Sequence, residues 1–234
     1  MFIYPEIEKN PLLHLCITEP LRLGSAEIIA RNGHGILAYD STARLHLLSA
    51  DCRAAAEDLL AGVENPYFIL CCQGKFAPLL DRFGFDHRMH CRQYAWLRNE
   101  RPGADSRLSI APPDDRAFAR ILENYTMSTP EELAMQRARG QVFFARDDSG
   151  TDVGFVGLHP EGCFGMLQVL EGQRGKGYGT ALEAFIIRWC LDHGRVPYCQ
   201  VSLENKVSIS LQKKLGLAET EETLIMAWND VFQA

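Results

Sequence analysis

The segment that most constrains this chain is a glycine-rich loop between a predicted strand and a predicted amphipathic helix. It reads Glu171-Gly-Gln-Arg-Gly-Lys-Gly-Tyr-Gly-Thr180 and contains four glycines. Glycine adopts backbone conformations closed to other residues and lets backbone N–H groups approach a ligand. At the start of a helix these groups are unpaired and carry partial positive charge, which suits a pyrophosphate. Arg174 and Lys176 add full charges, so we expect the loop to bind a phosphate-bearing ligand.

Two common phosphate-binding loops do not fit this segment. The dinucleotide fingerprint requires Gly-x-Gly-x-x-Gly, and the loop of nucleoside triphosphatases requires Gly-Lys followed by Ser or Thr. The run Gly177-Tyr-Gly179 satisfies neither pattern. A flexible turn that is basic by chance remains the alternative to anion binding.

The residues after the loop predict a helix. Apolar residues recur at helical spacing from Leu182 to Cys190, and Gly194 ends the pattern. Helix starts are also predicted at Pro112–Asp115 and at Ser128–Glu132, where Asp, Thr and Pro favour the first turn. The remaining predicted elements of this half are strands at 141–146, 153–159, 164–170, 198–203 and 223–228, and a helix at 207–215. We therefore expect an α+β fold with an antiparallel meander and one crossover helix.

The first hundred residues predict a smaller α/β unit. The turn signal Asn32-Gly33 separates two strand-like runs and predicts a hairpin. A helix at 50–61, a strand at 67–72 and a helix-like segment ending at Phe85 follow. The polar segment 98–106 reads as a linker. We expect two domains, at 1–100 and 107–234.

Composition excludes several classes of protein. The net charge of −6 argues against a nucleic-acid partner, whose phosphates require a basic surface. No apolar run is long enough to cross a bilayer, and the N-terminus lacks a secretory pattern, so we expect no membrane contact and a cytoplasmic protein. The eight cysteines form no Cys-x-x-Cys pair, so we expect reduced thiols and assign no metal.

Two spaced motifs resemble the GCN5-related N-acetyltransferases. Leu167-Gln-Val169, followed after two residues by Gln173-Arg-Gly-Lys-Gly-Tyr-Gly179, is similar to the acetyl-CoA signature of that family. Asn205, which opens the next helix after a strand, matches a second family element. The resemblance covers about residues 108–230. It implies a mixed, mostly antiparallel sheet with flanking helices and a central crossover helix.

The resemblance also implies a ligand and the residues that hold it. The expected cofactor is acetyl-CoA (coenzyme A). Its pyrophosphate would bind the loop, its pantetheine arm would pair with the preceding strand like an added strand, and Asn205 would hold the arm or the thioester. A plain helix cap is the alternative for Asn205. The expected cofactor-binding residues are Leu167, Gln168, Val169, Arg174, Gly175, Lys176, Gly177, Tyr178, Gly179, Thr180 and Asn205.

The two-part layout is also similar to double-domain relatives such as glycine N-acyltransferase-like proteins. By that resemblance the N-terminal half would be a degenerate copy of the same fold, because it contains no comparable glycine loop. We expect such a copy to wall the acceptor site or to pair two chains into a homodimer.

The catalytic groups depart from the family pattern. Many relatives carry a Tyr seven residues after the Asn and a Glu on the preceding strand, but this chain has Gln212 and Gln200 at those positions. Amides do not titrate, so another group serves or positioning alone carries the rate. The candidates are Glu204, His159 and Tyr198, for each of which a structural role is the alternative.

Two functions remain open from the sequence. The first is an N-acetyltransferase that transfers an acetyl (acyl) group from acetyl-CoA to a primary amine of a small molecule or a protein, by direct attack in a ternary complex. The second is a non-catalytic acyl-CoA sensor or regulatory module, which the two glutamines keep open.

Overall fold

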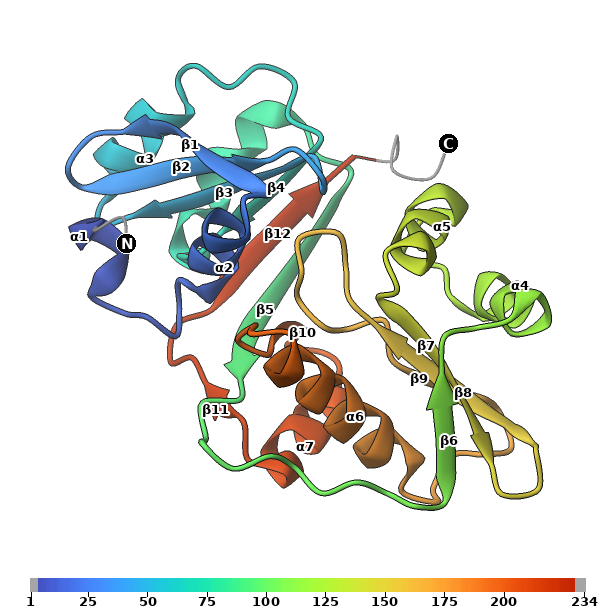
Figure 1. The fold of residues 1–234 in the computed structure, drawn as a ribbon. Helices are drawn as coiled ribbons and strands as arrows, with labels where there is room; N and C mark the ends of the chain where they lie inside the picture. The colour runs from blue at the N-terminus through green and yellow to red at the C-terminus, as the bar shows by residue number, and fades with distance from the viewer. Residues whose placement is uncertain (1–3, 230–234) are drawn as a thin grey trace. The chain divides into compact units, whose positions relative to one another are not determined.

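The structure is a computed structural model that describes residues 4–229. The chain divides into two compact units (Figure 1). Within the described residues, the first unit comprises 4–95, 200–209 and 218–229, and the second comprises 96–199 and 210–217. The end of the chain therefore contributes to both units.

The first unit is built on a sheet with the order β1-β2-β3-β4-β12-β5-β10, in which β11 also pairs with β5. Strands β3 and β4 are parallel, whereas β12 is antiparallel to both β4 and β5. The late strand β12 thus fills the gap between two early strands. The strands are β1 (Ala26–Arg31), β2 (Gly35–Asp40), β3 (Leu45–Ala50), β4 (Phe68–Cys71), β5 (His87–Ala95), β10 (Tyr198–Ser202), β11 (Ala218–Glu219) and β12 (Leu224–Trp228). The first two residues of β10 belong to the second unit.

Helices pack on both faces of this sheet. Helix α3 (Arg53–Leu60) and the 3-10 helix η1 (Gly74–Phe83) cover the face that carries Leu48, and form one buried apolar cluster with it. Helices α1 (Pro5–Glu8) and α2 (Leu15–Leu23) precede the sheet. His14 joins this segment to the opposite face of β3, because its Nε2 lies 2.8 Å from Oγ of Ser49.

The second unit holds a four-stranded antiparallel sheet with the order β6-β7-β8-β9. Apolar residues of α4, α5, β7 and β8 form its buried cluster. Helix α6 also packs on the sheet, since the Phe185 ring lies edge-on to Phe143 at 5.0 Å. The elements are β6 (Leu108–Ala111), α4 (Asp115–Asn124), α5 (Pro130–Ala138), β7 (Val142–Asp147), β8 (Asp152–Gly157), β9 (Gln168–Val169), α6 (Tyr178–Asp192) and α7 (Lys206–Leu215), the last of which runs across the division between the units.

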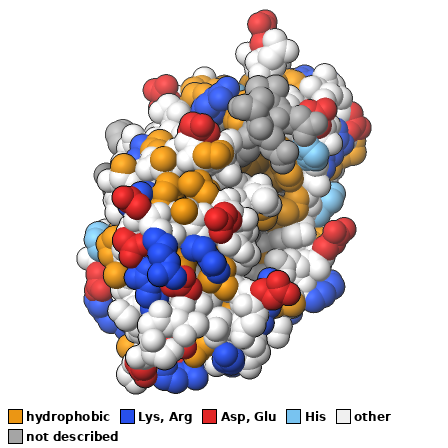
Figure 2. Space-filling model, turned by 90° about the vertical axis from the view of Figure 1, so that its right-hand side faces the viewer, with side chains coloured by type: hydrophobic (Ala, Val, Ile, Leu, Met, Phe, Trp, Pro, Cys, Tyr) orange, Lys and Arg blue, Asp and Glu red, His pale blue; other side chains and the backbone are white. Residues whose placement is uncertain are grey.

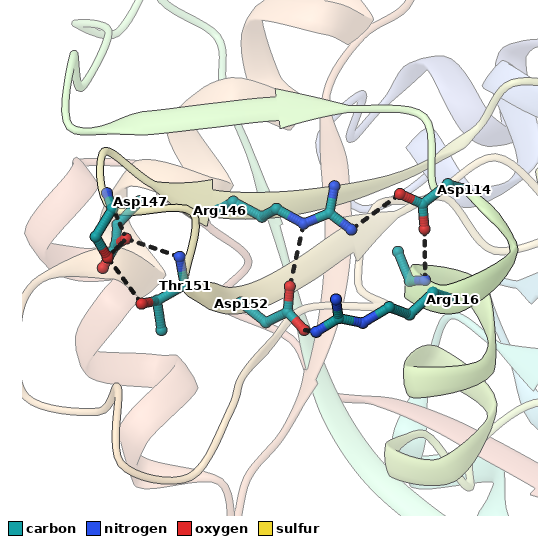
Figure 3. A network of polar contacts seen from close by, with 8 residues as sticks. Asp114, Arg116, Arg146, Asp147, Thr151 and Asp152 are labelled. Carbon is teal, nitrogen blue, oxygen red and sulfur yellow. Dashed lines mark hydrogen bonds and ion pairs between the residues drawn. The ribbon is translucent and has the colours of Figure 1, made fainter.

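Side chains fix the start of α4 against the meander (Figure 3). Asp114 accepts a hydrogen bond from the backbone N–H of Ala117 at 2.7 Å, which caps the helix. Arg146 of β7 donates to Asp114 at 3.0 Å and to Asp152 of β8 at 3.1 Å. Arg116 adds an ion pair to Asp152 at 3.6 Å. One charge network therefore ties α4, β7 and β8 together.

Charges of both signs lie side by side on the face of the molecule shown in Figure 2. Such mixing is expected where ion pairs join neighbouring elements. The pair between Arg137 of α5 and Asp115 of α4, at 2.7 Å, is one example.

The predicted fold class, α+β with mostly antiparallel sheets, is confirmed. The hairpin at Asn32-Gly33, the two capped helix starts and the helix after the glycine loop are also confirmed. No helix or strand lies between Ala95 and Leu108, as the linker prediction requires. All of the eight cysteines but Cys52 are buried.

One sequence-based expectation was incomplete, and some elements were not predicted. The strand expected at 164–170 is regular only at Gln168–Val169, although Phe164 forms an isolated bridge with Leu158. Strand β3 was not predicted, because its run Leu45–Ala50 lacks an alternating pattern: both of its faces are covered. The domain limits 1–100 and 107–234 stay a prediction.

Within residues 4–229, no helix combines the length and apolar character that crossing a membrane would need.

Candidate functional site

The glycine loop turns by means of three left-handed glycines. Gly172, Gly175 and Gly177 have φ angles of 81°, 79° and 84°, a region that other residues enter only with strain. Gly177 is the N-cap of α6 and offers no side chain to cap the helix. The loop therefore leaves the start of α6 without an internal cap.

The backbone N–H groups of the loop are free. Among the described residues, no protein acceptor receives a hydrogen bond from the N–H groups of residues 174–179. The flanking groups are paired: the Gln173 N–H donates to the Leu170 carbonyl at 3.0 Å, and the Thr180 N–H to the Gly177 carbonyl at 3.1 Å. Residues 174–177 are exposed. Six consecutive donors at a helix N-terminus are an arrangement suited to an anion.

Three cations surround these donors. Nε of Arg174 donates to the Val169 carbonyl at 3.3 Å, and Nζ of Lys176 donates to Oε1 of Gln173 at 2.8 Å. Arg107 donates to the Lys176 carbonyl at 3.4 Å and lies 5.4 Å from the Tyr178 ring centre. Its charge is balanced by Asp105, whose pKa the Arg107 hydrogen bond lowers.

Strand β9 presents an edge beside the loop. The Leu170 N–H donates to the Val153 carbonyl at 2.9 Å, so the alternation of an antiparallel ladder turns the backbone groups of Leu167 and Val169 away from β8. The Leu167 N–H already donates to the Gly165 carbonyl at 2.5 Å. Within the described chain, the Val169 N–H and the Leu167 carbonyl have no hydrogen-bond partner.

Gly154 of β8 allows β9 to lie where it does. A Cβ at position 154 would lie 2.3 Å from the Gln168 carbonyl oxygen and 3.1 Å from Cα of Val169. Real Cβ atoms do not approach a backbone oxygen so closely. The β8–β9 pairing therefore requires glycine at this position.

Two of the candidate catalytic residues lie in the second unit. Tyr198 is buried, and its hydroxyl donates to the Glu161 carbonyl at 3.2 Å, as a structural tyrosine does. His159 is half-buried, with its ring 6.4 Å from that of Tyr125. Burial raises the pKa of Tyr125, so its hydroxyl stays protonated.

Three other residues named from the sequence, Gln200, Glu204 and Asn205, lie in the first unit. Glu204 is exposed at the end of β10. Oδ1 of Asn205 accepts from the Ser208 N–H at 3.0 Å and so caps α7. Nε2 of Gln200 donates to Oε1 of Gln93 at 2.7 Å, so this amide is part of a partly buried hydrogen-bonded pair. The roles predicted for Glu204 and Asn205 stay predictions.

A separate hollow of about 350 Å³ lies in the first unit. It includes both non-glycine residues with positive φ in the described chain, Arg44 and Asn65, but each lies in a turn or loop between elements. Its lining is Ile29, Tyr39, Arg44, His46, Glu64, Asn65, Pro66 and Tyr67.

The free donors, the cations and the strand edge lie within a segment that a family profile also matches. The profile of the acetyltransferase (GNAT) family matches residues 91–217, more than half of the chain. This chain belongs to the acetyltransferase (GNAT) family. The glycine loop, β9 and α6 of this GNAT protein all lie inside the matched segment.

Solved structures of similar fold extend over both units. A Drosophila protein matches with a TM-score of 0.64 at 14% identity, covering 83% of this chain and 74% of that one. A GCN5-related N-acetyltransferase-like protein from Streptococcus suis matches with a TM-score of 0.55 at 14% identity, covering 96% and 99%. A GCN5-related N-acetyltransferase from Kribbella flavida matches with a TM-score of 0.56 at 12% identity, covering 94% and 95%. At these identities the likeness concerns the fold.

The comparison with curated protein sequences gave no match.

Arg107 and Gly154 were missed by sequence reasoning. Arg107 follows a polar segment, in which an arginine is not distinctive. Gly154 is a single glycine within a strand-like run. An isolated glycine in a strand often marks a close backbone approach, and this signal was available for Gly154.

Proposed function

We propose that this protein is an N-acetyltransferase that transfers the acetyl group of acetyl-CoA to a primary amine. The observation that carries the proposal is the run of six N–H groups at residues 174–179 that have no acceptor within residues 4–229. Beside them lie two exposed cations, Arg174 and Lys176, whose side chains donate to the Val169 carbonyl and to Gln173. A diphosphate would satisfy such donors. Family membership supports acyl transfer as the reaction class.

The loop and β9 would bind different parts of the cofactor. The segment 174–180 would hold the pyrophosphate through its backbone donors, and the edge formed by Leu167, Gln168 and Val169 would pair with the pantetheine amides. The Val169 N–H and the Leu167 carbonyl are the groups left for that pairing. Arg174 would leave the Val169 carbonyl to reach a phosphate oxygen. Asn205 is proposed as a further contact on the family resemblance alone.

The chemistry places two proton transfers on groups of the protein or on water. The acceptor amine attacks the thioester carbonyl, so a C–N bond forms and the C–S bond breaks. An alkyl ammonium has a pKa of about 10.4 and must first lose a proton, and the departing thiolate gains one. Gln212 and Gln200 cannot do either, so we propose direct attack in a ternary complex in which positioning carries most of the rate.

Of the candidate proton carriers, His159 and Glu204 have side chains that are not fully buried. His159 is half-buried and Glu204 is exposed. The Tyr198 hydroxyl is already engaged by the Glu161 carbonyl. We therefore place His159 and Glu204 ahead of Tyr198 as proposed proton carriers.

The second proposal is a non-catalytic acyl-CoA sensor. It rests on one feature of the sequence, because both positions at which many relatives carry a titratable group are occupied by glutamine here, and the family match does not favour it. In that case the loop would bind the same ligand without turnover.

One assay separates the two proposals. The pure protein is incubated with acetyl-CoA and a panel of small amines and lysine peptides, and release of free thiol is followed with a thiol reagent. The account predicts amine-dependent thiol release, together with protection from thermal unfolding by CoA. Protection without thiol release from any acceptor would favour the sensor. The absence of both protection and thiol release would refute the cofactor site.

A further inference from the structure

A buried carboxyl group in the second unit accepts a hydrogen bond from a buried amide. Glu183 of α6 and Gln212 of α7 are each 2% exposed. Nε2 of Gln212 donates to Oε2 of Glu183 at 3.0 Å. The remaining oxygens, Oε1 of Glu183 and Oε1 of Gln212, are buried, and within the described residues neither has a partner. Two buried oxygens without a hydrogen-bond partner in one side-chain pair require an explanation, because burying an unpaired acceptor is unfavourable.

A single proton shared between the two Oε1 atoms would give each of them a hydrogen-bond partner. A carboxylic acid and a primary amide can form a cyclic pair, in which the amide N–H donates to one carboxyl oxygen and the carboxyl O–H donates to the amide oxygen. The first of these bonds is present. The second needs a proton on Oε1 of Glu183. If the amide of Gln212 were flipped, its oxygen would face Oε2 of Glu183, and the carboxyl would again have to be the donor.

We infer that Glu183 is a neutral carboxylic acid that donates its proton to Oε1 of Gln212, and that this acid–amide pair is a pH-dependent link between α6 and α7. An ionised Glu183 would leave a buried charge with one hydrogen bond, next to a second unpaired oxygen. Hereafter the two residues are called the Glu183–Gln212 pair.

The surroundings of the pair favour the neutral form. Burial raises the pKa of the Glu183 carboxyl to about 8, and the hydrogen bond from Gln212 opposes this only in part. No charged side chain of the described chain acts on this carboxyl. The nearest basic residue on α6, Arg188, is occupied by the Pro102 and Gly103 carbonyls, and Lys213 and Lys214 of α7 are exposed.

The sign of the pH dependence follows from the raised pKa. The unfolded chain loses this proton near the ordinary glutamate pKa of about 4.3, whereas the folded chain keeps it until about pH 8. The stability from the pair is therefore complete below about pH 4, falls as the pH rises towards 8, and is lost above 8, where the folded carboxyl also ionises.

The test compares thermal unfolding of the full chain between pH 5 and pH 9 for the wild type and Glu183→Gln. Glutamine can form the same two-bond ring with Gln212 but cannot ionise. We expect equal melting temperatures near pH 5 and a Glu183→Gln variant that melts several degrees higher than the wild type at pH 8–9. Glu123→Gln, on the exposed face of α4, is the matched control and should follow the wild type.

A second readout reports the proton itself. The infrared spectrum of the wild type at pH 7 should contain the carbonyl band of a protonated carboxyl group, which disappears in Glu183→Gln and weakens above pH 8. A wild type without that band, or a Glu183→Gln variant less stable than the wild type at pH 8 with an unchanged pH slope, would overturn the inference. Glu183→Ala, which leaves Gln212 unpaired, should be less stable at every pH.

A consequence for ligand binding rests on the proposed function. Helix α6 begins at the glycine loop, and Glu183 lies within its first two turns. Loss of the pair above pH 8 should therefore weaken CoA binding in the wild type more than in Glu183→Gln. The two claims fail separately: a protein that never binds CoA refutes the cofactor site, while the melting and infrared data still decide the protonation of Glu183.

Discussion

The carbonyl oxygen of Val169, the last residue of β9, accepts a hydrogen bond from Nε of Arg174 at 3.3 Å. The loop's own arginine thus lies against the strand edge that we propose for the pantetheine arm. A guanidinium has five N–H donors, so Arg174 can meet a phosphate through more than one of them once it leaves the Val169 carbonyl. Binding would exchange one contact of this exposed arginine for stronger, charge-assisted ones.

Removing the loop cations should weaken CoA binding without changing the fold. Arg174→Ala and Lys176→Ala each delete an exposed charge, and we expect each to raise the Kd for CoA about 10-fold, because hydrogen bonds to charged groups contribute about 1.5–3 kcal/mol. Isothermal titration calorimetry at low and high salt measures the effect. Added salt should weaken CoA binding by the wild type more than CoA binding by a variant that carries both substitutions.

The matched control for these variants is Lys214→Ala. Lys214 is an exposed lysine in the last turn of α7. Its removal changes the net charge by the same amount, so it should leave the Kd unchanged. An equal loss of affinity in Lys214→Ala would mean that overall charge, and not the loop, attracts the ligand.

Gly154→Ala should displace β9. The new Cβ would lie 2.3 Å from the Gln168 carbonyl, and relieving such overlap costs about 1–3 kcal/mol. We expect a lower melting temperature and weaker CoA binding. Gly103→Ala is the control, because no atom lies within 4 Å of its added Cβ. Wild-type affinity in Gly154→Ala would show that the β8–β9 register does not matter for the ligand.

Tyr198→Phe should affect stability and not catalysis. The variant removes the hydroxyl that donates to the Glu161 carbonyl in a buried position. We expect a loss of about 1 kcal/mol in the free energy of unfolding, measured in urea, with an unchanged kcat for thiol release. A large fall in kcat at unchanged stability would instead return Tyr198 to the proton-carrying role.

Residues 1–100 should not fold alone. Strand β12 lies between β4 and β5, so a fragment that ends at residue 100 exposes the backbone edges of both strands. We expect little regular structure by circular dichroism and a tendency to aggregate. Cooperative unfolding of the isolated fragment would show that the N-terminal half is a self-sufficient domain.

Local rules account for the parts of the structure that the sequence predicted. Asp114 and Thr129 cap their helices, and Thr129 does so in a capping box with Glu132. The glycine loop also has a local cause, since three of its glycines adopt positive φ. Residues with such short-range roles reveal them in the sequence.

Long-range pairings account for the parts that the sequence did not predict. The position of β12 between β4 and β5 depends on a register set by strands more than 130 residues away. The sequence did not predict the Glu183–Gln212 pair either, because its two residues are 29 positions apart. From the sequence, Gln212 was notable only as a residue that does not titrate. Position 183 appears in the sequence as a polar residue on an amphipathic helix, and only the fold buries it.

The most direct test of the central claim is the affinity for CoA of Gly177→Glu, measured by calorimetry beside the wild type and Gly150→Glu. Both glycines have positive φ, 84° and 81°, and both substitutions add one negative charge, but Gly150 lies in the turn between β7 and β8. The account predicts that Gly177→Glu abolishes binding by blocking the loop and repelling the pyrophosphate, while its circular dichroism spectrum and the affinity of Gly150→Glu stay at wild-type values. Wild-type affinity in a folded Gly177→Glu protein would contradict the assignment of the loop.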